Sequence, residues 1–210
     1  MEKNMVVNLY DNMRKELKFL IPVHAEAELK NLLAIEGWKV LFPRRVVNSI
    51  YFDTINNDFL YDSIYGVSNR IKYRVRWYNN ERKFVVETKK KNAGVGTKVT
   101  SDSFSFNSEL PPEAMLVDCI RRISSTDLLQ KSKVSYLREY YIHPNSGSRL
   151  TLDFDISSID FESTIDRQVK SFFVLEVKAD LGVNFTVSFG RFQSRFSKYC
   201  FSRVGDDSFY

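Results

Sequence analysis

The feature that most constrains this fold is an alternation of charged and apolar side chains that recurs in six short segments. In residues 71–78, IKYRVRWY, Lys72, Arg74 and Arg76 fall on one face of a strand and mostly apolar side chains fall on the other, since strand side chains alternate between faces. The same alternation occurs in segments 14–21, 83–90, 136–141, 149–156 and 172–180. These patterns predict a sheet of many short strands.

Three stretches have helical spacing instead. Residues 24–36 repeat leucine along one face and end at Gly37, a residue type that commonly follows the C-terminus of a helix. A second helix is expected after the two prolines at 111–112, and a third in 189–201, where aromatic residues recur every three or four positions. Turn-forming residues separate the strand-like runs at 79–80, 92–96 and 143–148. The chain has no repeat or linker, so a single domain spanning residues 1–210 is expected.

The charged faces have two interpretations. One is an antiparallel sheet with a solvated outer face, on which charges of both signs form weak cross-strand pairs. The other is a closed barrel whose charged face lines the interior and whose apolar face points outward. This is possible because every segment carries enough large residues on its apolar face to pack against helices outside the barrel. Buried unpaired charge is costly, so a charged lumen would require a polyanion and a metal ion. We favour the second interpretation: an α+β fold with an antiparallel β-barrel, a charged lumen and helices packed outside.

Composition excludes several classes of protein. Lysine and arginine outnumber aspartate and glutamate by 31 to 26, and the net charge of +5 mildly favours polyanionic partners. No apolar run reaches the roughly 18 residues that a membrane helix needs, and the N-terminus does not resemble a signal peptide, so a cytoplasmic location is expected. Cys119 and Cys200 are expected to be buried thiols, and the distant His24 and His143 do not suggest zinc. The GVGTK segment, 94–98, lacks the spacing of a phosphate-binding loop and is expected to form a hairpin.

Eight segments, in order, resemble a known family. They are RKELKF, VNSIYFDT, RIKYRVRWY, VVETKKK, VSYLREYY, RLTLDFDI, FFVLEVKAD and RFSKYC. Together they are similar to the VTC domain, the polyphosphate polymerase branch of the triphosphate tunnel metalloenzymes, which are related to CYTH domains. The resemblance covers about residues 13–203. It implies a tunnel barrel in which basic side chains hold phosphates and acidic side chains hold a divalent metal.

The resemblance and the shared strand parity together nominate site residues. The expected catalytic residues are Lys18, Arg74, Arg76, Lys89, Arg138 and Lys198. The expected substrate-binding residues are Arg14, Arg70, Lys72, Tyr136, Arg149, Lys178 and Ser197. The resemblance implies that Glu176 and Glu16 bind the metal, Mn²⁺ or Mg²⁺. The wider superfamily often begins with ExExK, whereas Arg14 takes the first acidic place here, so one metal carboxylate is missing.

The resemblance implies a polyphosphate polymerase that transfers the γ-phosphate of ATP to a growing inorganic polyphosphate chain. The same residues would serve an inorganic triphosphatase or nucleoside triphosphatase, or a polyphosphate binder without activity. Binding of single-stranded nucleic acid is disfavoured, because Tyr73 and Trp77 lie on the face opposite Arg74 and Arg76 and would not offer stacking platforms beside them. A membrane partner protein and the oligomeric state stay open. Replacing Arg74 or Arg76 by alanine is expected to reduce activity heavily by weakening phosphate binding, and to leave the fold intact because crowding between like charges is relieved.

Overall fold

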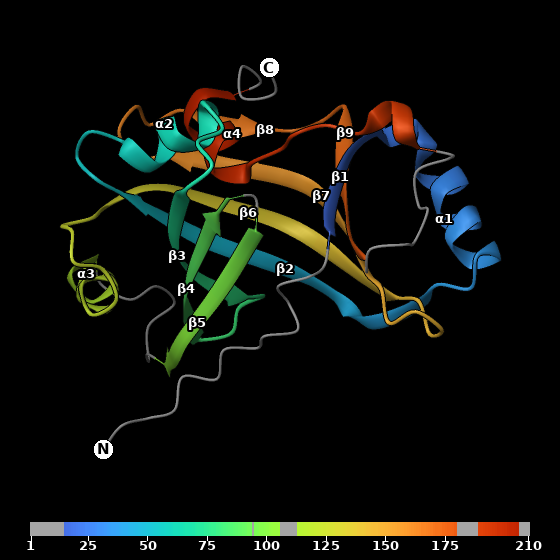
Figure 1. Cartoon of the computed structure of the whole chain (residues 1–210), viewed down its shortest axis with the longest axis horizontal. Helices are drawn as coiled ribbons and strands as arrows, with labels where there is room; N and C mark the ends of the chain where they lie inside the picture. Colours follow the sequence, from blue (N-terminus) through green and yellow to red (C-terminus); the bar gives the residue numbers. More distant parts are fainter. Residues whose placement is uncertain (1–14, 94, 106–112, 180–188, 206–210) are drawn as a thin grey trace.

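The computed structural model describes residues 15–93, 95–105, 113–179 and 189–205. Its strands are β1 (Lys15–Pro22), β2 (Lys39–Asp53), β3 (Arg70–Tyr78), β4 (Lys83–Asn92), β5 (Val95–Ser105), β6 (Leu129–Ile142), β7 (Arg149–Asp160), β8 (Asp166–Gln168) and β9 (Phe172–Ala179). The α-helices are α1 (Glu26–Ile35), α2 (Asp58–Ile64), α3 (Glu113–Arg121) and α4 (Lys198–Val204), and the 3₁₀ turns are η2 (Val23–Ala25) and η3 (Gly190–Phe192). The strands form one antiparallel sheet in the order β1-β9-β7-β6-β2-β3-β4-β5, with β8 beside β7 (Figure 1).

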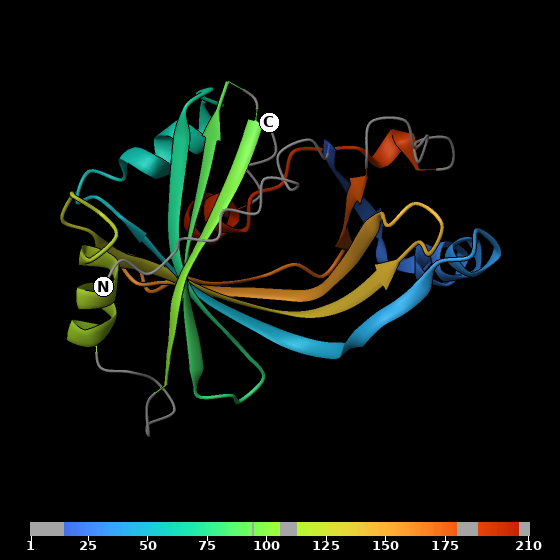
Figure 2. The same ribbon diagram turned by 60° about the horizontal axis from the view of Figure 1, so that its bottom comes forward.

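The sheet is strongly curled. β1 is the first strand in this order and β4 the seventh, so a flat sheet would separate them by about 29 Å at ~4.8 Å per strand. Instead, Lys89 Nζ of β4 lies 3.0 Å from a carboxylate oxygen of Glu16 on β1. Figure 2 shows β2, β6 and β7 bending along their length while β3, β4 and β5 cross over them. The described parts of β1 and β5 do not pair, so side chains rather than a backbone ladder bring the two ends of the sheet together.

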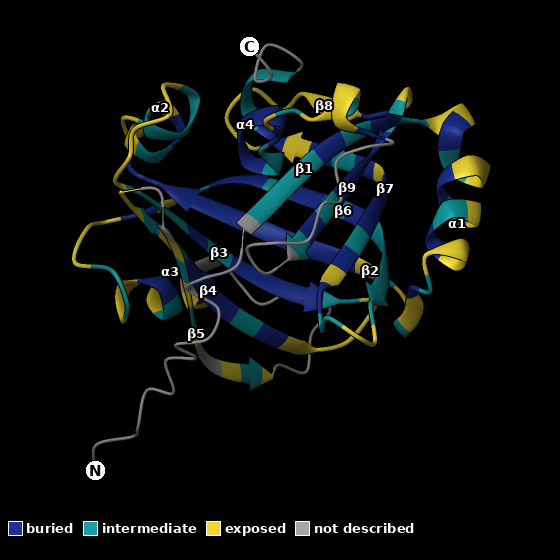
Figure 3. Ribbon diagram, turned by 45° about the vertical axis from the view of Figure 1, so that its right-hand side comes forward, coloured by how far each residue is buried: buried dark blue, intermediate teal, exposed yellow. Residues whose placement is uncertain are grey.

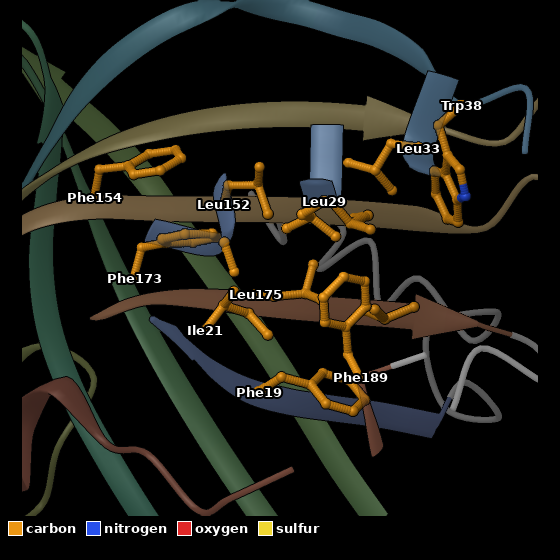
Figure 4. Close-up of a cluster of buried hydrophobic side chains, with 13 residues drawn as sticks. Phe19, Ile21, Leu29, Leu33, Trp38, Leu152, Phe154, Phe173, Leu175 and Phe189 are labelled. Atoms are coloured by element: carbon orange, nitrogen blue, oxygen red, sulfur yellow. The ribbon is translucent and has the colours of Figure 1, made fainter. Parts of the chain in front are cut away.

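Helices cover the convex side, as the large apolar residues of the strands predict. Leu29 and Leu33 of α1 pack with Phe19, Leu152 and Phe173 from β1, β7 and β9 (Figure 4). A second cluster joins α3 to β3 and β4 and includes Tyr73 and Trp77, which are only 7% and 5% exposed. Figure 3 shows that α1 is exposed only on the side turned away from the sheet. The expected barrel-like α+β architecture is confirmed.

The helix α4 packs against the concave side. Its Tyr199 and Cys200 share a cluster with Val47 and Tyr51 of β2 and Tyr136 of β6. The Tyr199 ring stacks on that of Tyr51 at a centroid distance of 5.1 Å. The Tyr199 hydroxyl donates a 2.6 Å hydrogen bond to the buried carboxylate of Asp53, which also accepts from backbone N–H groups at the start of α2. A structural carboxylate thus fixes α4 against the inner face.

Three expectations about elements need correction. The single helix expected in 189–201 is interrupted, because Gln193 bridges to Phe19 and the Ser194 N–H donates to the Lys18 carbonyl, which draws this segment along β1. In β7, Asp155 has a φ of 50° beside a register shift in the β6–β7 pairing, so Phe154 and Ile156 enter different clusters.

Cys200 is buried as predicted, whereas Cys119 is only partly buried; both thiols are free.

Alternation and helical spacing did not predict every element of the fold. The strands β2 and β5 and the helix α2 were not predicted from alternation or helical spacing. The described residues of GVGTK, 95–98, do lie in a hairpin, with Asn92 of β4 paired to Val95 of β5. No helix in the described part of the chain is long and apolar enough to cross a lipid bilayer.

Candidate functional site

The concave face holds a buried carboxylate surrounded by cations. Glu87 of β4 is 4% exposed, and its Oε2 lies 2.6 Å from Arg74 and 3.6 Å from Arg76 of β3. Lys98 of β5 also pairs with it. Burial alone would raise the pKa of Glu87, but these three cations outweigh it and hold that pKa far below its usual range. Glu87 therefore stays ionised and orients the paired arginines.

Arg74 and Arg76 also donate hydrogen bonds to hydroxyl groups. Arg74 Nη1 donates to the Tyr51 hydroxyl at 3.3 Å, and Arg76 Nη2 donates to the Tyr136 hydroxyl at 3.1 Å. Ser49 Oγ accepts from Arg76 Nε at 3.3 Å. These contacts use some of the five N–H donors that each guanidinium carries. Both guanidinium groups are held rigidly on the inner face.

A second ion cluster lies farther along the same face. Asp153 of β7 is fully buried and accepts from Arg138 of β6, with Nη2 2.7 Å from Oδ2. Lys198, the first residue of α4, pairs with the same carboxylate and lies 4.5 Å from the centroid of the Tyr136 ring. Burial would raise the pKa of Asp153, but Arg138 and Lys198 lower it below its usual range. The helix thereby adds a cation to the row supplied by the strands.

The third cluster contains the two carboxylates that the resemblance assigned to a metal. Lys18 Nζ lies 3.5 Å from Glu16 and 3.8 Å from Glu176, on neighbouring strands β1 and β9. Lys89 pairs with Glu16, and Lys178 lies 3.9 Å from Glu176. Burial opposes ionisation of Glu176, yet Lys18 and Arg138 keep its pKa well below the usual range. Both carboxylates are thus available as anionic oxygen ligands.

These residues fit a phosphate-bound divalent ion better than a cage made by protein alone. No group of three or more acidic, histidine or cysteine side chains suited to a metal occurs in the described residues. Mg²⁺ sites of phosphate-handling proteins commonly use one or two carboxylates, with phosphate oxygens and water as the remaining ligands. Glu16 and Glu176 would supply such a pair. Glu16 and Glu176 also pair with lysines, but their side chains are 27% and 14% exposed, whereas Glu87 and Asp153 are almost fully buried against arginines.

Lys72 of β3 and Ser197 lie near the point where α4 begins. Lys72 Nζ donates to Ser197 Oγ at 2.7 Å, and the same Oγ accepts from the Cys200 N–H as the N-cap of the helix. Burial, with like charges at Lys18 and Lys89, lowers the pKa of Lys72 to about 8. Ser197, predicted to bind substrate, therefore also has a structural role.

The structure does not bring every nominated residue together. Arg14 lies outside the described residues. Arg149 has the predicted strand parity and lies opposite Lys178 in the β7–β9 pairing, but its side chain is exposed at the start of β7 and takes part in none of the three ion clusters. Arg70 turns away and donates to the Val67 carbonyl at 2.7 Å. The other nominated residues line the concave face in the three ion clusters or beside them.

Sequence reasoning gave no role to several residues of this face. Lys98 belongs to GVGTK, which was assigned to a hairpin and given no further role. Ser49 and Tyr51 lie in VNSIYFDT, where their spacing of two would have placed them on one face. Asp153 lies on the charged face that the alternation in 149–156 predicts, but its partners Arg138 and Lys198 come from other elements.

The chain was compared with curated proteins and with solved structures. No protein with curated annotation matches the chain in sequence. A candidate adenylate cyclase from Vibrio parahaemolyticus has a similar structure, with a TM-score of 0.54 at 9% identity over 89% of this chain and 95% of that chain. A candidate adenylate cyclase from Bacillus halodurans has a TM-score of 0.49 at 17% identity, over 86% of this chain and 87% of that chain. The first of these likenesses shows a shared fold.

The family is established by sequence. The sequence profile of the VTC domain matches residues 13–203, which contain all the described strands and nearly all of α4. The residues that build the three ion clusters all lie within this match. The chain therefore belongs to the VTC domain family.

Proposed function

We propose that this protein is a polyphosphate polymerase that uses ATP as its phosphoryl donor. Family membership supports a tunnel-fold enzyme that acts on phosphate compounds. The observation that carries the finer proposal is a series of six cations on the concave face, held in place by ion pairs with Glu16, Glu87 and Asp153: Lys18, Arg74, Arg76, Lys89, Arg138 and Lys198. A linear polyanion matches such a series better than a compact anion does.

The residue types suit phosphoryl transfer. The reaction needs alignment of donor and acceptor and neutralisation of charge on the equatorial oxygens, rather than covalent help from the protein. Arg74 and Arg76, fixed by Glu87 and by tyrosine hydroxyls, present planar forks that match phosphate oxygens. Preorganised donors of this kind stabilise charge without reorganising during the reaction.

The proposed reaction needs no reactant other than ATP and the polyphosphate chain. A terminal oxygen of the polyphosphate chain attacks the γ-phosphorus of ATP, a new P–O bond forms, and the bond from that phosphorus to the β–γ bridging oxygen breaks. ADP leaves with the electron pair. Arg74 and Arg76 would hold the transferred group, while Arg138 and Lys198 would hold the acceptor chain. A divalent ion at Glu16 and Glu176 would neutralise phosphate charge when bound.

A single assay tests this proposal. Pure protein is incubated with ATP and Mn²⁺, and both long-chain polyphosphate and free phosphate are measured. Accumulation of polyphosphate together with ADP is the expected result. Release of free phosphate alone would instead make the protein a triphosphatase, with water as the acceptor, and no turnover would leave a phosphate-binding domain. Nucleic acid is not an expected partner, because Tyr73 and Trp77 are buried beneath α3.

A further inference from the structure

A second basic site lies on the same concave face, where β2 begins. Arg45 is directly opposite Arg138 in the β2–β6 pairing. Like charges at directly opposed positions are unfavourable in a sheet. Arg138 is neutralised by Asp153, but none of the described acidic side chains forms an ion pair with Arg45. One member of this arginine pair therefore lacks a counter-charge within the described chain.

Aromatic rings hold the Arg45 guanidinium in place. Its Cζ lies 4.5 Å from the centroid of the Tyr78 ring, 4.8 Å from that of Tyr140 and 5.3 Å from that of Phe42. Such contacts favour a cation over the ring faces but leave the in-plane N–H groups free. The Arg45 Nε is buried and has no hydrogen-bond partner among the described residues. The side chain is thus preorganised, with donors that the protein does not satisfy.

A β-bulge builds this arrangement. Residues 42 and 45 differ by an odd number and would point to opposite faces of a regular strand. Pro43 lacks the N–H needed for the backbone ladder, and the β2–β6 register shifts between Phe42 and Arg45. Both side chains consequently contact Tyr140. Bulges of this kind commonly redirect side chains beside functional sites.

A second unsatisfied group lies across β6 from this arginine, on the neighbouring strand β7. Thr151 of β7 is directly opposite Tyr140, and its buried Oγ1 has no hydrogen-bond partner among the described residues. Native proteins rarely leave such groups unpaired, so each one points to a missing partner. Arg45 and Thr151 flank Tyr140 from opposite sides, β2 and β7. We define Phe42, Arg45, Tyr78, Tyr140 and Thr151 as the Arg45 site.

We propose that the Arg45 site binds a phosphate group of a polyphosphate chain that extends from Arg74 and Arg76 past Arg138, which Arg45 faces across the β2–β6 pairing. Its donors are a planar guanidinium and a hydroxyl, both suited to phosphate oxygens. Stacking of a nucleobase is disfavoured, because the guanidinium already covers faces of the three rings. Arg45 lies four residues along β2 from Ser49, the residue opposite Arg76, or about 13 Å at ~3.3 Å per residue, so a short triphosphate centred on Arg74 and Arg76 would not reach it. The site thus selects for chain length, an inference that rests on the proposed function for its ligand class.

Calorimetric titration of the full chain with tripolyphosphate, ATP and long-chain polyphosphate tests this inference. Arg45→Ala and Arg45→Lys are compared with Arg44→Ala, a control that removes the same charge from the neighbouring position, where Arg44 pairs with Glu139. We expect Arg45→Ala to weaken long-chain binding roughly tenfold, the usual cost of losing a charged hydrogen bond. Tripolyphosphate and ATP binding should change less than about twofold in the same variant. Arg45→Lys should restore long-chain binding only in part.

Several outcomes would overturn the inference. Equal weakening for all three ligands would place Arg45 in the central site, and weakening for ATP alone would mean a nucleoside contact. An unchanged long-chain affinity, or an equal loss in Arg44→Ala, would also exclude a specific phosphate site. Thermal melting of each variant separates these results from misfolding. Because binding needs no turnover, failure of the polymerase assay would leave this test intact.

Discussion

At the scale of single residues, the charges of the concave face are organised in pairs. The sequence shows Arg74 and Arg76 as neighbours of like sign, which led to the expectation that removing one would relieve repulsion. The structure reverses this, because the buried Glu87 lies against both guanidinium groups. The alternation identified the inward face correctly but could not reveal which charges face each other across the sheet.

Replacing Arg74 by alanine should therefore lower stability as well as phosphate affinity. Glu87 would lose its main partner while remaining buried, and we expect the free energy of unfolding to fall by about 2 kcal/mol. Denaturant unfolding of the variant measures this loss. Arg121→Ala is the control, because Arg121 forms only exposed pairs, with Asp118 and Asp127, and such pairs contribute little. Equal stability of Arg74→Ala and the wild type would contradict the pairing.

Lys72 should make phosphate binding sensitive to alkaline pH. Its pKa of about 8 in the folded protein is below the ordinary value, so it loses its charge as the pH rises from 7 to 9. Tripolyphosphate affinity should fall over this range by up to about tenfold more than in Lys72→Arg, which stays charged. Parallel pH profiles in both proteins would exclude the role of Lys72.

The same shift affects stability in the opposite sense. Below pH 8 both the folded and the unfolded chain carry the Lys72 proton, and the folded state bears the full cost of burying the charge. Between about 8 and 10.4 the unfolded state binds more protons than the folded state. The contribution of Lys72 to the free energy of unfolding therefore rises with pH across this window. Comparing denaturant unfolding of the wild type and Lys72→Met at pH 7 and 9.5 isolates that contribution.

Glu176→Gln should remove metal binding in the presence of phosphate. The change preserves the shape of the side chain but deletes one of the two anionic ligands beside Lys18. Titration of Mn²⁺ with a non-hydrolysable ATP analogue present should show at least a roughly tenfold loss of metal affinity. Glu139→Gln, outside the three ion clusters, is the control. Equal affinity in wild type and Glu176→Gln would reduce Glu176 to a partner of neighbouring lysines.

At the scale of elements, helix α4 shows what sequence patterns could not provide. The aromatic spacing of 189–201 indicated buried residues correctly but merged two segments that pack in separate clusters. Phe189 contributes to the cluster beneath α1, whereas Tyr199 packs on Tyr51. The break depends on pairing of 193–194 with β1, a contact distant in sequence. Strand parity needs only local order, so it was more successful than the helix boundary, although it was interrupted at Asp155 of β7.

Ser197 links the position of α4 to the charge of the concave face. Ser197→Ala should lower the free energy of unfolding by about 1 kcal/mol, because the Cys200 N–H loses its cap. Ser197→Asp should keep the cap but place a carboxylate beside Lys72, so stability is retained while tripolyphosphate affinity falls. Melting curves and calorimetry on both variants separate these effects. Full phosphate affinity in Ser197→Asp would show that this end of the face does not contact the ligand.

At the scale of the whole molecule, the sequence predicted a sheet whose charged face points inward and whose apolar face is covered by helices. Large apolar residues on one face of every strand require a covering layer, and α1 and α3 provide it on the convex side. The degree of curling was not predictable, because it depends on contacts such as Lys89 with Glu16 between strands far apart in the sheet. The bulge at Pro43 was equally hidden, since it is defined by the register against β6.

The most direct test of the central claim is a crystal structure of the protein with tripolyphosphate and Mn²⁺, with the metal located by anomalous scattering. The account predicts phosphate density on the concave face against Arg74 and Arg76, and a manganese peak beside Glu16 and Glu176. Phosphate on the convex face, or manganese bound away from both carboxylates, would contradict it.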